Sequence, residues 1–449
     1  MTTRFTHVIM WVIMRLSFFA SKKSIGYEMS KKIKILTLSD HPLSPSGVGT
    51  QTRYVIEALL KTGKFQVLSL GGAIKHQDYT PKIVEPWNED WKIIPVDGYG
   101  TPEMIRSILR NEKPDILWMM TDPRFYEWLW QIENEIRPLI PIVYYHVWDN
   151  FPPPHFNRKF YESNDLVVAI SKLTRDIVKE VAPNVPLKYI PHAVREDIFV
   201  PPSQEERVEL RKQVLGQDKD RFIAFWNNRN ARRKQSGTLI WWWKEWLDKR
   251  DLHEKAQLIM HTEPYDPHGQ DLNRIVETLG LDSSRQVLFS TQKVQLEQMG
   301  NFYRIADVTI NISDAEGFGL ATLESLSCGT PIIANMTGGL QEQVIGSEGE
   351  NGVALFPSAK SIIGSQQVPY IYEDRVSKES FHAALDKMYF LEDESRRQLG
   401  QQGFRHVRTN YSFESFCQQW VNTMIEVYEE CGSWETRKGY NGIVFKEVA

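Results

Sequence analysis

Short apolar runs alternate with helix-period stretches through the first half of the chain. The runs that we predict as strands are 33–38, 66–70, 115–119, 142–145 and 166–169. Stretches with apolar residues at helical spacing separate them, as at 51–61, 102–111 and 172–181. Continuous apolar strands that alternate with helices are typical of a parallel sheet covered on both faces. The pattern therefore predicts a doubly wound α/β domain.

The second half repeats this alternation after an irregular, proline-rich stretch at 190–202, which we interpret as a linker. Its predicted strands are 222–225, 257–260, 286–289, 307–312, 331–334 and 352–356. A chain of 449 residues is also too long for one compact core. We predict two α/β domains that face one another across a cleft, with ligands beyond the carboxyl ends of the strands.

Three segments fall outside this alternation. Residues 358–374 show no clear period and are predicted to be an exposed insertion, whereas 412–430 is strongly helical and rich in aromatic residues. The apolar stretch 8–20 is interrupted by Arg15 and is too short to span a bilayer. The predicted limits are an N-terminal extension, disordered, peripheral or a mis-assigned start, at 1–28, a first domain at 29–196, a second at 197–410, and a final helix and tail at 411–449.

Composition excludes some classes of protein. The 53 basic and 57 acidic residues give a net charge of −4, so no global field attracts nucleic acid. Three cysteines cannot build a disulfide framework and show no metal-ligand spacing, which predicts a reducing, cytoplasmic location and no metal. Five tryptophans gather in one region, and we expect them in the core: Trp226, Trp241, Trp242, Trp243 and Trp246.

The strongest candidate chemistry lies after the predicted strand 307–312. Glu316 and Glu324 flank a turn that contains Gly317 and Gly319, and a helical pattern follows from Leu320. Glycines let backbone amides approach a ligand closely, and a helix N-terminus attracts an anion. Carboxylates accept hydrogen bonds from hydroxyl groups. The combination predicts a site for a polyhydroxylated anion such as a nucleotide sugar.

The string from Glu316 to Glu324, followed by Gly329-Thr330-Pro331 and Gly338-Gly339, resembles the donor site of retaining GT-B glycosyltransferases, family 4 in particular (glycosyl transferases group 1). The resemblance implies the GT-B fold, in which two Rossmann-like domains face a cleft. It also implies that Glu324 holds the ribose hydroxyls of the donor and that Glu316 holds the hexose and serves catalysis. The turn residues implied to contact the donor are Gly317, Phe318, Gly319 and Leu320.

Basic residues follow the predicted strand 222–225 within the stretch Trp226–Lys234. Cations just past a strand end are placed to neutralise a diphosphate. Arg229 and Lys234 match the spacing of the catalytic, phosphate-binding pair in the resembled family, although Asn228 and Gln235 depart from its usual Gly-Arg-x4-Lys-Gly pattern. Arg232 and Arg233 compete for the same role.

Two features of the first half complete the predicted site. Gly47, Val48 and Gly49 follow the first strand, and the resemblance implies that this loop closes over the donor; a plain tight turn is the alternative. His146 ends a buried strand and matches a histidine that the family uses near the donor, so we count it among the catalytic candidates. His192 and His261 are left open as hinge or base-region residues.

These observations predict an enzyme that moves a hexose from a UDP- or GDP-sugar, with retention, to a glycan, a lipid-linked acceptor or a small molecule, for example in polysaccharide biosynthesis. No cofactor is required, and membrane contact is at most peripheral, at the inner face. Two alternatives stay open: a nucleotide-sugar epimerase of the same fold, which is not expected to carry the Glu316–Glu324 string, and a catalytically silent carbohydrate-binding protein.

Overall fold

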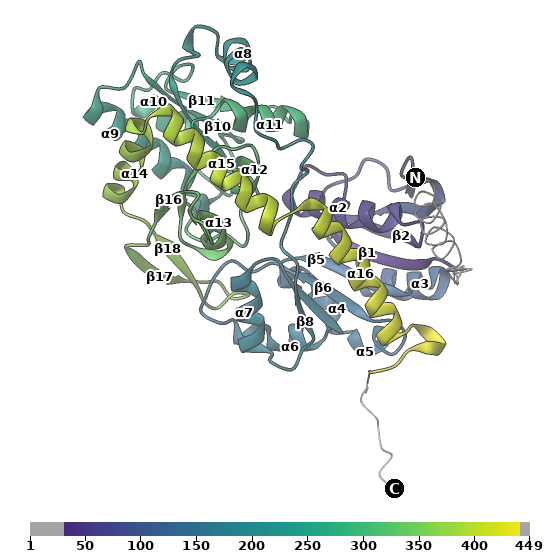
Figure 1. Ribbon diagram of the computed structural model, residues 1–449. Coiled ribbons are helices and arrows are strands. Elements are labelled where there is room, and N and C mark those ends of the chain that lie inside the picture. The colour runs from purple at the N-terminus through teal and green to yellow at the C-terminus, as the bar shows by residue number, and fades with distance from the viewer. Residues whose placement is uncertain (1–30, 441–449) are drawn as a thin grey trace, which may run out of the picture.

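The structure is a computed structural model that describes residues 31–440, so the extension predicted at 1–28 lies outside the described residues. Two separate, predominantly parallel sheets with helices packed around them form the two halves of the molecule (Figure 1). This arrangement confirms the predicted α/β architecture of two Rossmann-like domains. No helix between residues 31 and 440 combines the length and the apolar character that crossing a bilayer requires.

The first sheet has eight strands in the order β3-β4-β2-β1-β5-β6-β7-β8, and only β3 runs antiparallel to its neighbour. Its strands are β1 (Ile33–Asp40), β2 (Phe65–Gly72), β3 (Lys82–Ile83), β4 (Trp91–Pro95), β5 (Ile116–Thr121), β6 (Ile142–His146), β7 (Leu166–Ala169) and β8 (Leu187–Tyr189). Its helices are α2 (Gly47–Lys61), α3 (Pro102–Glu112), α4 (Glu127–Trp130), α5 (Glu133–Ile136), α6 (Arg158–Glu162) and α7 (Lys172–Val181).

The second sheet has six parallel strands in the order β11-β10-β9-β12-β13-β16. The strands of this half are β9 (Phe222–Asn227), β10 (Ala256–His261), β11 (Val287–Ser290), β12 (Val308–Asn311), β13 (Ile332–Asn335), β14 (Ile345–Gly346), β15 (Gly349–Glu350), β16 (Gly352–Leu355), β17 (Ala359–Ile363) and β18 (Ile371–Arg375). Its helices are α8 (Gln204–Leu215), α9 (Ser236–Arg250), α10 (Leu272–Thr278), α11 (Leu296–Ile305), α12 (Leu320–Ser327), α13 (Gln341–Val344), α14 (Lys378–Phe390) and α15 (Asp393–Asn410), and the last helix of the chain is α16 (Phe413–Cys431).

Each predicted strand has its counterpart in the structure, while seven strands were not predicted: β3, β4, β8, β14, β15, β17 and β18. The tryptophan prediction holds in part. Trp226, Trp243 and Trp246 are completely buried and Trp242 packs against the same core, but Trp241 is 45% exposed. The prediction for Trp241 is wrong because α9 carries three successive tryptophans, and consecutive side chains of a helix point to different faces.

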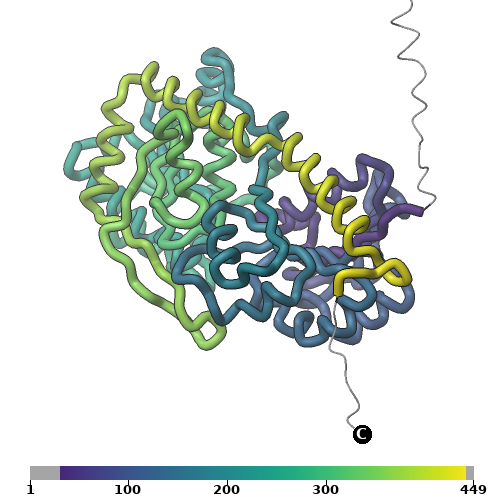
Figure 2. The backbone as a smooth tube through the Cα atoms, turned by 60° about the horizontal axis from the view of Figure 1, so that its bottom comes forward, coloured from purple at the N-terminus to yellow at the C-terminus, as the bar shows by residue number. Residues whose placement is uncertain are grey.

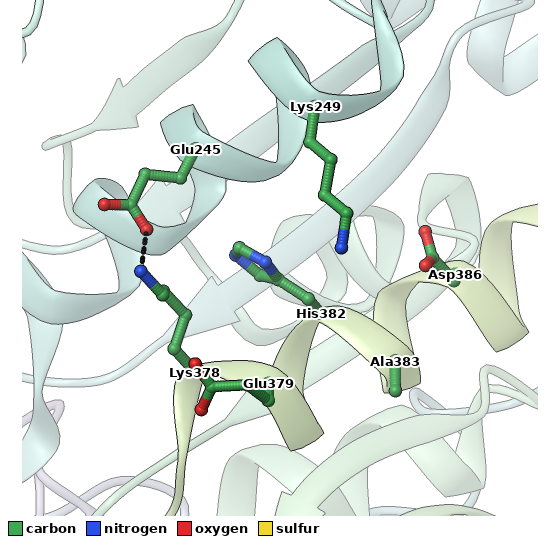
Figure 3. Close-up of a pocket in the computed structure, with 7 residues that line it drawn as sticks. All are labelled: Glu245, Lys249, Lys378, Glu379, His382, Ala383 and Asp386. Carbon is green, nitrogen blue, oxygen red and sulfur yellow. Dashed lines mark ion pairs between the residues drawn. The ribbon is translucent and has the colours of Figure 1, made fainter.

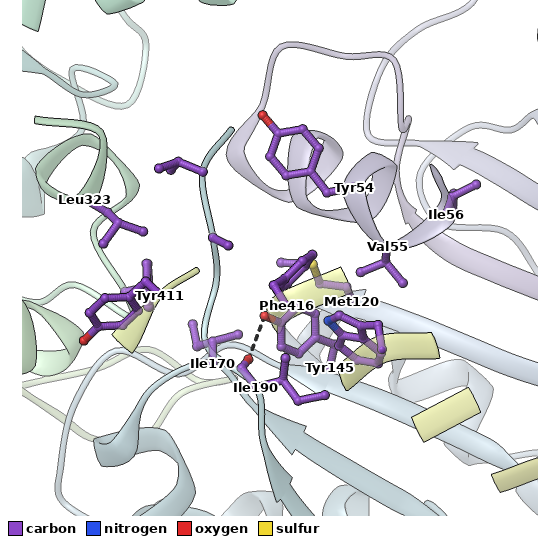
Figure 4. Close-up of a cluster of buried hydrophobic side chains, with 14 of the residues drawn as sticks. Tyr54, Val55, Ile56, Met120, Tyr145, Ile170, Ile190, Leu323, Tyr411 and Phe416 are labelled. Atoms are coloured by element: carbon purple, nitrogen blue, oxygen red, sulfur yellow. Dashed lines mark hydrogen bonds between the residues drawn. The ribbon is translucent and has the colours of Figure 1, made fainter. Parts of the chain in front are cut away.

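The long C-terminal helix joins the two halves. Figures 1 and 2 show α15 over the second half and α16 running on across the first, where α16 packs against α2. One apolar cluster contains residues of both halves, and Figure 4 draws Tyr54 of α2 and Phe416 of α16 together with Leu323 of α12 and Tyr411 from this cluster. Burying this shared surface is favourable, so the halves are held together by core packing as well as by the linker.

The segment predicted to be an exposed insertion forms a hairpin of β17 and β18; β17 is largely exposed, as predicted, whereas β18 is partly buried and contacts the first half. The Tyr372 amide donates to the Phe151 carbonyl at 2.6 Å, and the Tyr370 ring meets Phe156 edge-on at 5.1 Å. Val368 and Ile371 pack against the apolar core of the first sheet. The aperiodic sequence is explained by this contact, because the hairpin buries parts of itself against another domain rather than against its own sheet.

Asn150 and Asp374 form the most buried polar contact of this bridge, which leads to a testable prediction. The Asn150 amide donates to Asp374 Oδ2 at 2.7 Å, and the two residues are 3% and 2% exposed. Asn150→Ala leaves a buried carboxylate without that donor, so we expect a loss of roughly 1–3 kcal/mol in the free energy of unfolding. Urea denaturation measures it. Asn111→Ala, which removes an exposed amide, should leave the midpoint unchanged; equal midpoints for all three proteins would contradict the prediction.

Candidate functional site

Acidic and basic side chains meet at the carboxyl ends of β9 and β12, where the sequence predicted the donor site. After β9 the chain makes a 3₁₀ turn at Arg232–Lys234, and the Lys234 ammonium forms an ion pair with Glu316. Arg233 lies beside them: its Nη1 donates to the Ala315 carbonyl at 2.6 Å, and its Nε is 3.6 Å from an Asp149 carboxylate oxygen. The site thus contains two cations and two carboxylates, one of them from the first half.

The Lys234–Glu316 pair is largely withdrawn from solvent, with side-chain exposures of 9% and 13%. Burial acts to raise the pKa of Glu316, but Lys234 and Arg233 outweigh it, and the net shift is downward. Burial and the neighbouring Arg233 lower the pKa of Lys234, against the opposing effect of Glu316. Glu316 is therefore an ionised carboxylate that fixes the lysine and can accept hydrogen bonds from hydroxyl groups.

Two glycines in the left-handed region shape the backbone around Glu316. Gly319 has φ +91° and occupies the N-cap of α12, so no side chain there can accept from the first amides of that helix. Gly338 has φ +52°, and a Cβ at this position would collide with the Glu316 carbonyl. The Gly339 amide donates to that same carbonyl at 3.0 Å. The predicted glycine turn is thus held by backbone contacts that larger residues would break.

Glu324 lies one turn inside α12. Its Oε2 accepts a hydrogen bond of 2.6 Å from the Tyr303 hydroxyl of α11. Burial raises the pKa of Glu324 to about 7, against the lowering effect of the Tyr303 hydrogen bond. At pH 7 Glu316 is therefore ionised, whereas Glu324 is only partly ionised.

The predicted glycine loop of the first half lies next to the start of α12. Ser46 caps α2 by accepting from the Gly49 amide at 2.9 Å, so Gly47-Val48-Gly49 is the first turn of a helix. A Cβ on Gly47 would lie 3.0 Å from a methyl group of Leu320, the first residue of α12. The N-termini of α2 and α12 therefore approach one another across the two halves. Both ends carry free amides suited to an anion.

Other predicted turn residues contact the first half as well. A Cβ on Gly317 would lie 3.0 Å from the Asp149 carboxylate. Phe318 is buried between the halves, with its ring 4.9 Å from that of His192. The Gly317–Phe318 turn is therefore part of the contact between the domains.

Two predicted residues do not join the Lys234–Glu316 pair. Arg229 is exposed and binds Asp266 through two hydrogen bonds of 2.7 and 3.1 Å. Arg233, which lies within the 3₁₀ turn, is the arginine beside Glu316, with Nη1 3.9 Å from a Glu316 carboxylate oxygen. The role predicted for Arg229 stays a prediction, but this arrangement favours Arg233.

His146 is completely buried, and its two ring nitrogens lie 3.0 and 2.8 Å from the hydroxyls of Tyr144 and Tyr161. Burial lowers its pKa to about 3, so the ring is neutral. The geometry gives the ring a structural role at the end of β6, and its predicted catalytic role receives no support from these contacts. His192 is also buried, with Nδ1 2.7 Å from the Tyr145 hydroxyl, while His261 is partly exposed at the end of β10.

Sequence reasoning missed Asp149, Asn227 and Tyr303, which complete the surroundings of the two glutamates. A signal for Tyr303 was present: a tyrosine at a buried helical position needs a partner for its hydroxyl. Arg233 was considered only as a competitor of Arg229. No spacing rule relates Asp149 to Glu316, because the two carboxylates lie near the same Arg233 only once the two halves are packed.

Elsewhere, a cavity of about 400 Å³ lies between α9 and α14 (Figure 3). Two ion pairs lie at its rim, Lys378 with Glu245 at 3.0 Å and Asp386 with Arg250. His382 contacts the Trp242 carbonyl at 2.8 Å. Lys249 and Glu379 complete its charged lining. Within residues 31–440, no cluster of His, Cys, Asp and Glu has the arrangement of a metal site.

Comparison with known proteins finds similarity to glycosyltransferases. The family profile of Glycosyl transferases group 1 matches residues 209–406, which include Arg233, Lys234, Glu316 and Glu324. A D-inositol 3-phosphate glycosyltransferase of Corynebacterium jeikeium is 30% identical over 194 residues, 42% of this chain and 45% of that protein. A GDP-mannose-dependent alpha-(1-6)-phosphatidylinositol monomannoside mannosyltransferase of Mycolicibacterium smegmatis is 28% identical over 207 residues, which are 44% of this chain and 50% of that protein. The chain spans about half the length of these curated relatives.

Solved structures extend the likeness to the whole fold. Sucrose-phosphate synthase from Thermosynechococcus elongatus superposes with a TM-score of 0.71 at 18% identity, covering 89% of this chain and 100% of that one. Anabaena Alr3699/HepE in complex with UDP and glucose gives a TM-score of 0.64 at 16% identity, covering 88% and 100%. The fold is therefore GT-B, as the sequence predicted.

Proposed function

We propose that the protein is a retaining glycosyltransferase of family 4 that moves a hexose from a UDP- or GDP-sugar to a glycan, a lipid-linked acceptor or a small molecule. The observation that carries the proposal is the buried Lys234–Glu316 pair beside the N-terminus of α12, with Glu324 one turn further along. Cations and helix amides suit a diphosphate, and carboxylates suit sugar hydroxyls. The match of Glycosyl transferases group 1 to this half supports the same reading.

In the proposed reaction, Lys234, Arg233 and the helix amides stabilise negative charge that develops on the departing diphosphate. Glu316 holds the hexose hydroxyls, and Glu324 holds the ribose. The departing phosphate takes the proton of the acceptor hydroxyl on the same face of the sugar, which leads to retention. We assign donor binding to a domain at 197–410 and acceptor binding to a domain at 29–196, with 411–449 crossing back; any contact with a membrane is peripheral.

Relatives and neighbours guide the choice of donors and acceptors to test. One curated relative is named for GDP-mannose, and one solved neighbour holds UDP and glucose. Relatives named for inositol phosphate, phosphatidylinositol mannoside and monoglucosyldiacylglycerol suggest a polyol or lipid-linked acceptor. We therefore propose testing UDP- and GDP-sugars first.

A thermal-shift screen tests the proposal. UDP-glucose, UDP-galactose, UDP-N-acetylglucosamine and GDP-mannose, with UDP and GDP, should include at least one ligand that raises the unfolding midpoint. Ligand at 100 times its Kd adds about 2.7 kcal/mol to the stability of the folded protein. Glu324→Gln should reduce the shift, whereas Glu245→Gln on α9 should not. Equal midpoints with every nucleotide would contradict the proposal.

A further inference from the structure

A tyrosine hydroxyl connects Glu324 to the end of β9. The Asn227 side-chain amide donates to the Tyr303 hydroxyl at 2.8 Å, and that hydroxyl donates to Glu324 Oε2 at 2.6 Å. Tyr303 is completely buried. The chain of hydrogen bonds joins α11 and α12 to the strand whose following turn carries Lys234.

The direction of these bonds is fixed by chemistry. An amide nitrogen can only donate, so the Tyr303 oxygen accepts from Asn227 and its single hydrogen is directed to the carboxylate. The ring has little freedom, since it meets Phe225 edge-on at 5.0 Å and the Tyr303 carbonyl accepts from Thr330 Oγ1 at 2.7 Å. Within residues 31–440, only Oε2 of the Glu324 carboxylate has a hydrogen-bond partner. Oε1 is thus left for a ligand.

We infer that Tyr303, oriented by Asn227, is a positioning residue that holds the Glu324 carboxylate with one oxygen turned to the hydroxyls of the nucleotide donor. This inference rests on the proposed function. Tyr303 itself does not contact the donor. It acts by keeping Glu324 in one rotamer and by favouring its ionised form, which accepts hydrogen bonds from hydroxyls better than the protonated acid does.

The electrostatics around Glu324 agree with this role. The ionisable groups that face it are Tyr303 from α11, Tyr54 from α2 and Cys328 at the end of its own helix. Burial raises the pKa of all three neighbours, so each is neutral at pH 7. The Tyr303 hydrogen bond lowers the pKa of Glu324, which burial raises to about 7. Without this bond, the pKa rises further and a smaller fraction of Glu324 is ionised at pH 7.

Tyr303→Phe tests the inference through donor affinity and its pH dependence. With the nucleotide sugar identified by the thermal screen, we expect the Kd to rise about tenfold or more at pH 7, as for loss of a hydrogen bond to a charged group. The pH at which donor affinity is half-maximal should move upward. Tyr126→Phe is the matched control, because its buried hydroxyl donates to the Leu38 and Met120 carbonyls in the first half. It should leave the donor Kd unchanged.

Three further measurements test the inference. In the ligand-free protein, ¹³C NMR of the Glu324 carboxyl should show a higher pKa in Tyr303→Phe than in the wild type. Asn227→Ala should also raise the donor Kd and the pKa of Glu324, but by less than Tyr303→Phe does. This variant serves as the test if Tyr303→Phe does not fold. A double variant of Tyr303→Phe and Glu324→Gln should bind no more weakly than Glu324→Gln alone.

The outcomes separate this inference from the proposed function. A wild type that binds none of the nucleotide sugars would overturn both. A donor-binding wild type whose folded Tyr303→Phe variant keeps the same Kd, the same pH midpoint and the same Glu324 pKa would overturn the positioning role alone. Tyr303 would then be a structural tyrosine of α11.

Discussion

Lys234→Ala is expected to lower kcat by roughly 10²–10³-fold with the best donor, as for the loss of one group that stabilises charge developing in the transition state. The reason is local. Lys234 is a buried cation at the carboxyl end of β9, held in place by Glu316 and flanked by Arg233. The variant removes the point charge that we assign to the leaving diphosphate. Release of nucleoside diphosphate, followed in a coupled assay, measures the effect.

Control variants show whether the expected decrease in kcat is specific to Lys234. Lys249→Ala removes an exposed lysine from α9 and should keep full activity. Arg233→Ala should cost more activity than Arg229→Ala, because Arg233 lies near Glu316 whereas Arg229 pairs with Asp266. The reverse order would return the role to Arg229, as the spacing in the sequence predicted. A folded Lys234→Ala variant with wild-type kcat would remove Lys234 from the reaction.

Glu316→Gln is the second large effect that we expect, a decrease in kcat/KM of about 10- to 150-fold. A hydrogen bond that involves a charged group contributes roughly 1.5–3 kcal/mol, and 1.4 kcal/mol corresponds to a factor of ten. The substitution keeps the shape of the side chain but removes the charge that pairs with Lys234 and to which we assign the sugar hydroxyls. Initial rates over a range of donor concentrations give kcat and KM separately.

The fold of the variant needs its own measurement, since Glu316→Gln leaves Lys234 and Arg233 without their shared carboxylate. A buried unpaired charge is costly, so some loss of thermal stability is expected as well. Glu245→Gln, on the surface of α9, serves as the matched control. If Glu316→Gln folds and retains wild-type kcat/KM, then Glu316 contributes only to the packing of the turn between β12 and α12.

Strands in the centre of each sheet could be predicted because both of their faces are buried. β9, β12 and β13 are short apolar runs, and apolar runs between helical stretches identify buried parallel strands. β4 and β8 escaped prediction, since β4 alternates buried and half-buried residues and β8 is half-buried throughout. Their patterns are typical of positions near the edge of a sheet, where one face or one side is less covered.

The candidate site could be predicted where it is local in sequence and not where it depends on packing. Glu316, Gly319 and Glu324 lie in one turn and one helix, so their spacing carries information. Tyr303 and Glu324 come from different helices, and only the contact of α11 with α12 brings them together. Arg229 was preferred to Arg233 from spacing, but in the structure Arg229 pairs with Asp266 while Arg233 lies near Glu316.

The contacts of the β17–β18 hairpin could not be predicted from the sequence either, because they depend on how the two domains pack. Its residues have no period because they contact the loop after β6, from Asn150 to Phe156, as well as their own half. The Asp374 carboxylate is buried against Asn150 of the first half, so the packed pair of domains accounts for its burial.

The most direct test of the account is to follow the donor itself by NMR. With the nucleotide sugar selected by the thermal screen, ³¹P spectra should show nucleoside diphosphate released by the wild type and far less by Lys234→Ala. ¹H spectra of the first-formed sugar product should show the anomeric configuration of the donor. A wild type that leaves every nucleotide sugar intact, or whose product has the inverted configuration, would contradict a retaining glycosyltransferase.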